Sequence, residues 1–123
     1  MLPVAAHPNR LTAAVSSFTV GGAGPMSINA LQAGSAGTCS INAAAANGYT
    51  PGQVYTIQMT AGGEHRFEQS AGTIAGNPYN QDSYRWTAPA AGGTVTFRAL
   101  CATGRTTGYL TSAAVNAGGG GGN

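Results

Sequence analysis

The sequence predicts an all-β fold, a two-sheet antiparallel sandwich of about seven strands. Several segments alternate apolar and polar residues with a period of two, which is the signature of half-buried strands. Gly, Pro and Asn separate these segments at the spacing of 8–12 residues that is typical of sandwiches. No stretch has the spacing of an amphipathic helix. At 123 residues the chain has the length of a single domain.

The composition favours a folded domain that carries little charge. The chain has five Arg, no Lys and three acidic residues, for a formal net charge of +2. Disorder requires a high net charge, so this balance favours folding, although Leu, Ile, Val and Phe together make up less than a fifth of the residues and predict a thin core. The Arg residues form no cluster, which argues against nucleic-acid binding. No apolar run is long enough for a transmembrane segment.

The first half of the chain contains strand signals of unequal strength. Residues 11–20 alternate loosely, and residues 26–31 are a second short candidate after the turn at Gly24-Pro25. The pattern sharpens at Cys39 and Ile41, which share a face. Residues 53–60 then place three side chains on one face, with Thr56 and Gln58 on the other. Those three are Tyr55, Ile57 and Met59.

The second half predicts four more strands. Residues 64–70 set His65 and Phe67 opposite Glu64, Arg66 and Glu68. Two further strands follow at 83–87 and 94–101, and a weaker one runs from about 105 to 115. The inward positions define the expected core: Tyr55, Ile57, Met59, Phe67, Trp86, Val95 and Phe97.

The two cysteines predict one disulfide. Cys39 and Cys101 lie far apart, without the Cys-x-x-Cys spacing of a redox motif or a zinc site. A bridge that closes a loop of roughly 60 residues would stabilise the domain by about 4 kcal/mol, and it implies secretion into an oxidising compartment. We expect the two strands that carry the cysteines to lie side by side. The alternative is a pair of buried free thiols.

Several motifs in order resemble the Reeler (reelin N-terminal-like) domain. They are a Tyr49-Thr50-Pro51-Gly52 turn, an aromatic strand HRFEQS followed by AGTI, a strand end Trp86-Thr87-Ala88-Pro89, and the strand Val95-Thr96-Phe97-Arg98-Ala99. The resemblance implies an immunoglobulin-like sandwich of the kind found in secreted, matrix, cell-surface and defence-type proteins, with no catalytic residues to carry over. The chain departs from the family over residues 70–83, which are short, and it lacks the family's middle cysteine and Thr-His pair.

The resemblance divides the chain into three parts. Residues 37–115 form the expected sandwich, and residues 1–36 are an N-terminal extension that we expect to add a strand to its own sheet or donate one to a neighbour. Residues 116–123 are a Gly-rich tail that predicts flexibility. A lipid anchor at Asn123 is a minor hypothesis, because small residues flank such attachment sites.

The sequence predicts no catalytic site, cofactor or metal. Ser and Thr are frequent, but no Gly-x-Ser-x-Gly elbow is present. Glu64 and Glu68 share a face on which a cation could bind, yet a solvated face with Arg66 between them is the favoured interpretation. A metal-dependent redox activity through His7 and His65 is the remaining enzymatic alternative, and it lacks ligands at diagnostic spacing.

Two functional hypotheses follow. The first is a non-catalytic structural or adhesive module of the cell surface that self-associates into a layer or filament, because so weakly charged a surface repels its own copies very little. The alternative is a monomeric secreted module that binds a polysaccharide or microbial surface, with sugars stacked on Tyr79, Tyr84 or Trp86. For Trp86, a core position is the favoured interpretation.

Overall fold

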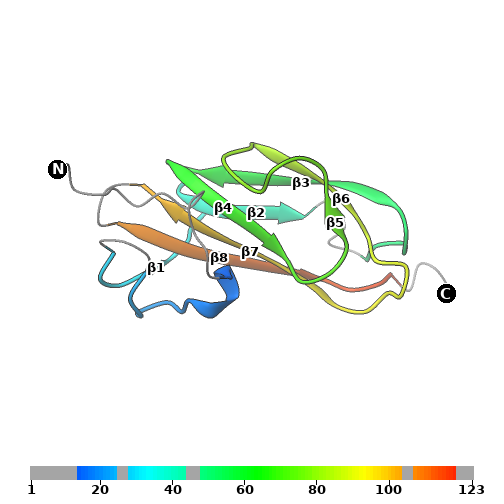
Figure 1. Ribbon diagram of the computed structural model, residues 1–123, viewed down its shortest axis with the longest axis horizontal. Coiled ribbons are helices and arrows are strands. Elements are labelled where there is room, and N and C mark those ends of the chain that lie inside the picture. The colour runs from blue at the N-terminus through cyan, green and yellow to red at the C-terminus, as the bar shows by residue number, and fades with distance from the viewer. Residues whose placement is uncertain (1–13, 25–27, 44–47, 104–106, 119–123) are drawn as a thin grey trace.

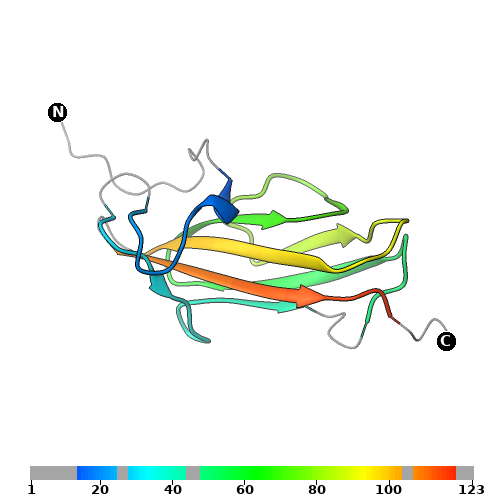
Figure 2. The same ribbon diagram turned by 90° about the horizontal axis from the view of Figure 1, so that it is seen from below.

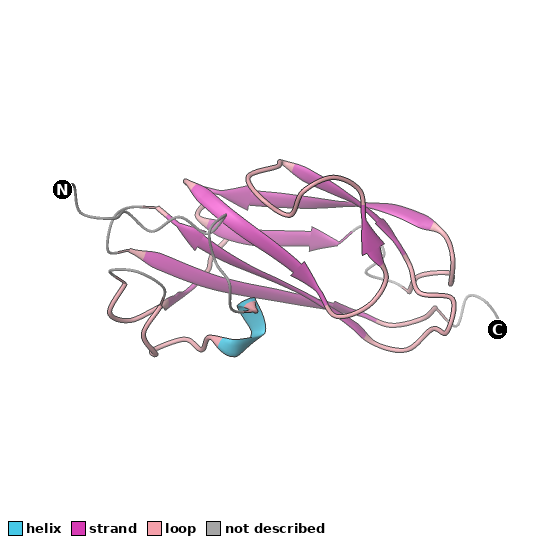
Figure 3. Cartoon of the chain, in the orientation of Figure 1, coloured by secondary structure: helices cyan, strands magenta, loops and turns pink. Residues whose placement is uncertain are grey.

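Two four-stranded sheets pack face to face in the computed structural model, which describes residues 14–24, 28–43, 48–103 and 107–118 (Figures 1 and 3). The elements are a short 3-10 helix η2 (Val15–Ser17) and the strands β1 (Gln32–Ala33), β2 (Cys39–Ala43), β3 (Val54–Ala61), β4 (Glu64–Gln69), β5 (Thr73–Ile74), β6 (Ser83–Thr87), β7 (Val95–Ala102) and β8 (Gly108–Val115). The predicted all-β sandwich is confirmed, with eight strands in the described part of the chain rather than about seven.

The strand order is that of a constant-type immunoglobulin domain. We call the sheet with the order β1-β8-β7-β4 sheet A and the one with the order β2-β3-β6-β5 sheet B. Sheet B corresponds to the immunoglobulin strands A-B-E-D, and β4, β7 and β8 correspond to C, F and G. β1 is an additional edge strand that pairs in parallel with β8, whereas all other strand pairs are antiparallel.

Alternation along the strands builds the core between the sheets. In β6 the buried residues Tyr84 and Trp86 alternate with exposed neighbours, and β3 buries Ile57 and Met59 in the same way. Phe67, Val95 and Phe97 are buried on the facing sheet, whereas Tyr55 is half-buried and packs against the core.

Aromatic rings are the largest buried side chains of this small core. Trp86 makes edge-to-face contacts with Tyr49 and Phe97, at centroid distances of 5.2 and 4.9 Å, and Phe67 stacks on Tyr84 at 4.3 Å. The indole N–H of Trp86 donates to the Ala71 carbonyl at 2.9 Å. Large rings with satisfied polar atoms thus compensate for the scarcity of aliphatic residues.

The N-terminal segment is not the pair of strands that the sequence predicts. Residues 14–20 of the loosely alternating stretch contain η2 and no strand, and residues 11–13 lie outside the described part. Residues 28–31 of the second candidate are irregular, and the strand β1 begins only at Gln32. Strand propensity was too weak here to compete with packing onto the neighbouring sheet.

This segment instead covers part of the outer face of sheet A (Figure 2). Val15, Ile28 and Leu31 form a second apolar cluster with Leu100 and Ala102, two β7 residues whose side chains point away from the main core. The C-terminal end of β7 is therefore buried on both faces. The described part of residues 1–36 packs on its own sandwich, and β1 adds a strand to its own sheet.

The start of the predicted flexible tail is held by hydrogen bonds. Tyr49 N donates to the Asn116 carbonyl at 3.0 Å, and Gly118 N donates to the Tyr49 carbonyl at 2.6 Å. Ala117 N donates to the Gly93 carbonyl. Residues 116–118 are thus paired with the sandwich, while the rest of the tail, Asn123 included, lies outside the described residues.

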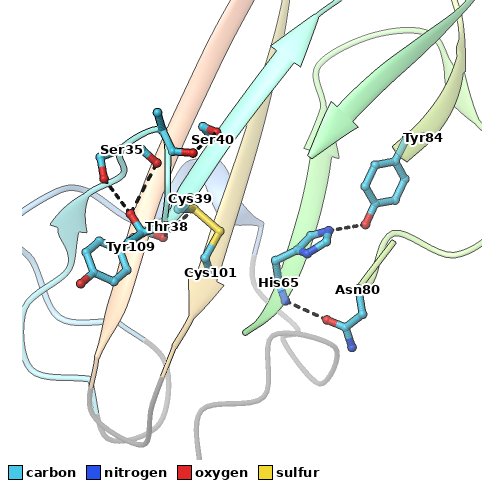
Figure 4. Close-up of a disulfide and its surroundings, with 10 residues drawn as sticks. Ser35, Thr38, Cys39, Ser40, His65, Asn80, Tyr84, Cys101 and Tyr109 are labelled. Atoms are coloured by element: carbon cyan, nitrogen blue, oxygen red, sulfur yellow. Dashed lines mark hydrogen bonds between the residues drawn. A yellow bond between two sulfur atoms is a disulfide. The ribbon is translucent and has the colours of Figure 1, made fainter. Parts of the chain in front are cut away.

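The predicted disulfide is confirmed, but it joins the two sheets. Cys39 on β2 and Cys101 on β7 are bonded, with their Cα atoms 5.9 Å apart (Figure 4). β2 belongs to sheet B and β7 to sheet A, so the two strands face each other rather than lying side by side in one sheet. Antibody domains link strands B and F, so the position of this bridge differs from theirs.

Candidate functional site

Two of the three predicted sugar-stacking residues are in the core. The side chains of Tyr84 and Trp86 are 1% and 0% exposed, so neither ring presents a face to a ligand. Tyr79 is half-buried, and the guanidinium of Arg66 lies over its ring, 5.2 Å from the centroid. The structure therefore does not assemble these three residues into a stacking platform.

His65 and Tyr84 form a buried polar pair. Nε2 of His65 and the Tyr84 hydroxyl are 2.5 Å apart, and Gln81 N donates to the same hydroxyl (Figure 4). Burial lowers the pKa of His65 from 6.5 to about 4, against the opposing effect of Asp82. Burial also raises the pKa of Tyr84 to about 12, opposed by the Gln81 hydrogen bond. Both groups are neutral at pH 7, and their hydrogen bond satisfies polar atoms within an apolar core.

The acidic residues considered for a cation site have other partners. Both carboxylate oxygens of Glu68 accept backbone hydrogen bonds, from Val15 N at 2.9 Å and Ser16 N at 3.0 Å. Sequence reasoning missed this contact, because it joins residues more than 50 positions apart. Within the described ranges, no three His, Cys, Asp or Glu side chains gather into a group that could hold a metal ion. His7 lies outside those ranges.

The outer face of sheet B is a regular and nearly uncharged surface. The alternation that buries Ile57 and Met59 turns every second residue of β3 outward, and β2, β5 and β6 continue this face in register. The outward side chains, which we call the sheet B face, are Ser40, Asn42, Val54, Thr56, Gln58, Thr60, Thr73, Ser83, Arg85 and Thr87. All except Ser40 are exposed, and Arg85 is the only charged one.

Parts of the other surfaces of the sandwich are covered, in contrast to the sheet B face. The N-terminal segment packs on the outer face of sheet A, and the loop at 77–80 covers the free edge of β4. Phe67 N donates to the Pro78 carbonyl there, and Asn80 N donates to that of His65. Such coverage prevents strand edges from pairing with other chains. The sequence identified Thr56 and Gln58 as outward, but it gave no sign that four strands align such residues.

The sheet B face suits another neutral surface better than it suits a charged ligand. Its hydroxyl and amide groups both donate and accept hydrogen bonds, and the face holds one cation and no anion. Comparison of the chain with known proteins gives no match to a family model, to a curated protein or to a solved structure. Among the described residues, no helix is long and apolar enough to cross a membrane.

Proposed function

We propose that this protein is a non-catalytic, extracellular structural module whose copies self-associate through the sheet B face. The observation that carries the proposal is the alignment of outward Thr, Ser, Asn and Gln side chains across four strands with a single charge among them. A layer or filament at a cell surface would be built by repeating this contact.

Self-association through this face depends on weak repulsion as much as on attraction. Surface charges of one sign keep soluble proteins apart, and gatekeeper charges on sheets prevent association. Arg85 is the only charged side chain on the sheet B face, so neither kind of charge protects this face from association. Polar side chains can stay hydrogen-bonded when two such faces meet, directly or through water, so their burial costs little.

The extracellular location is supported by the disulfide, since such bridges persist in oxidising compartments. The Reeler-like motifs of residues 37–115 favour the same location and remain a prediction. The alternative of a glycan-binding module loses the support of Tyr84 and Trp86, because both rings are buried.

Adding charge to the sheet B face tests the proposal. We expect the native chain to sediment as species heavier than the 12.1-kDa monomer, in a concentration-dependent manner. In the double variant Gln58→Glu/Thr60→Glu, two carboxylates enter the contact and repel those of the next copy, so sedimentation velocity should show monomers. Both positions are exposed, and folding should be preserved.

A matched control adds the same charge elsewhere. Thr103→Glu/Ala114→Glu also introduces two carboxylates at exposed positions, but neither belongs to sheet B, and we expect it to associate like the native chain. A native chain that stays monomeric at every accessible concentration would refute self-association. If the control and the test variant dissociate equally, the sheet B face is not the contact.

A further inference from the structure

A groove lies on the outer face of sheet A, between the N-terminal segment and β8. It has a volume of about 500 Å³, and the residues that matter for its chemistry are Phe18, Thr19, Val20, Arg98, Leu110 and Ser112. This volume is within the range of about 300–1,000 Å³ that is usual for small-molecule sites. The groove is distinct from the sheet B face, because the two lie on opposite sides of the sandwich.

The walls of the groove are mostly apolar and partly open to solvent. Phe18 and Leu110 are half-buried, and Val20 is 57% exposed, one of two large hydrophobic residues among those described that are exposed. The hydroxyl groups of Thr19 and Ser112 add polar atoms. An apolar surface with a few polar groups is the usual lining of a ligand site.

Among the described residues, Arg98 is the only charged one in this lining. The acid directly opposite it across the β4–β7 pair is Glu68, whose two oxygens are occupied by Val15 N and Ser16 N. The guanidinium therefore lines an apolar groove while the carboxylate beside it is engaged in holding the groove's wall in place.

We propose that this groove binds a linear aliphatic carboxylate, with its head group on Arg98 and its chain along Phe18, Val20 and Leu110. A guanidinium matches the two oxygens of a carboxylate in a bidentate pair. A phosphate monoester carries close to two charges at pH 7 and would require a second cation, which the described lining lacks. The binding does not depend on self-association.

Calorimetric titration of the full chain with decanoate, below its micelle concentration, tests the proposal. We expect saturable binding of one decanoate per chain. Decanol lacks the charge and butyrate lacks the long chain, so both should bind at least about tenfold more weakly. Amide chemical shifts should change at Val20, Leu110 and Ser112.

Two variants connect the binding to the groove. Arg98→Gln should weaken decanoate binding about tenfold or more, whereas Arg85→Gln, on the opposite face, should leave it unchanged. If Arg98→Gln fails to fold, Val20→Asp serves instead, because it places a repelling carboxylate at an exposed rim position. No saturable binding by the native chain, or equal binding by the Arg98 and Arg85 variants, would overturn the proposal. Titration of the Gln58→Glu/Thr60→Glu variant should give the native affinity, which separates this result from the association test.

Discussion

His65 is an ionisable residue that the fold keeps neutral. Its side chain is 3% exposed, and its ring packs edge-to-face on Tyr84 and hydrogen-bonds to it. Asn80 Oδ1 accepts a hydrogen bond from its backbone N–H. A charge on this ring would be poorly solvated because the ring is buried, and the field of Asp82 offsets this effect only in part.

We expect His65 to make the stability of the domain depend on pH. Its pKa is about 4 in the folded state and about 6.5 in the unfolded state, so protons bind the unfolded state first. Stability is therefore complete above about pH 6.5 and is lost as the pH falls towards 4, by roughly 1–3 kcal/mol. Urea unfolding at several pH values checks this expectation. His65→Gln provides the reference, since it leaves every carboxylate in place, and an identical pH dependence in both proteins would contradict the assignment.

At the scale of elements, the contact between Glu68 on β4 and the start of η2 fixes the N-terminal segment. Two N–H groups that have no partner within so short a helix are satisfied by one carboxylate. The apolar cluster of Val15, Ile28 and Leu31 then packs on Leu100 and Ala102 of β7. A polar contact through the backbone of η2 and an apolar cluster that includes the Val15 side chain thus attach this segment to sheet A.

Removal of the Glu68 carboxylate should loosen this attachment. We expect Glu68→Ala to lower the free energy of unfolding by roughly 1–3 kcal/mol, because hydrogen bonds to a charged acceptor are among the stronger ones. Amide hydrogen exchange should accelerate at Val15 and Ser16. Glu68→Gln keeps one acceptor oxygen and should give intermediate values. If all three proteins protect these two amides equally, the carboxylate does not hold the segment.

At the scale of the whole molecule, the disulfide is a covalent link between the two sheets across the core. Cys39 and Cys101 are both fully buried and are 62 positions apart in sequence. The bridge therefore restricts the unfolded chain over half of its length, while in the folded state it lies beside the aromatic core.

We expect the double variant Cys39→Ala/Cys101→Ala to lose about 4 kcal/mol of stability, the value that chain entropy gives for a loop of this size. The m-value in urea should rise, because the unfolded chain without the bridge exposes more surface. The native protein, measured once with the bridge intact and once after its reduction, provides the comparison. A loss below about 1 kcal/mol would show that the core alone holds the sheets together.

Alternation in the sequence predicted the strand positions whose side chains point into the core between the sheets. In β3, β6 and β7, period two identified Ile57, Met59, Trp86, Val95 and Phe97 as inward, because successive side chains of a strand point to opposite faces. The same pattern could not show that Leu100 and Ala102 are buried on the opposite face of β7, since the segment that covers them lies more than 60 residues earlier.

By itself, the sequence determined the all-β class and most strand positions, which follow from local periodicity and turn residues, and it favoured a bridge between the two cysteines over a pair of free thiols. Only the tertiary structure decided that the bridge joins opposite sheets, that Tyr84 is a core rather than a surface ring, and that outward polar residues of four strands form one face. The physical reason is the range of the interactions. Periodicity reports the two faces of one strand, whereas sheet membership and the cover on each outer face depend on contacts between distant segments.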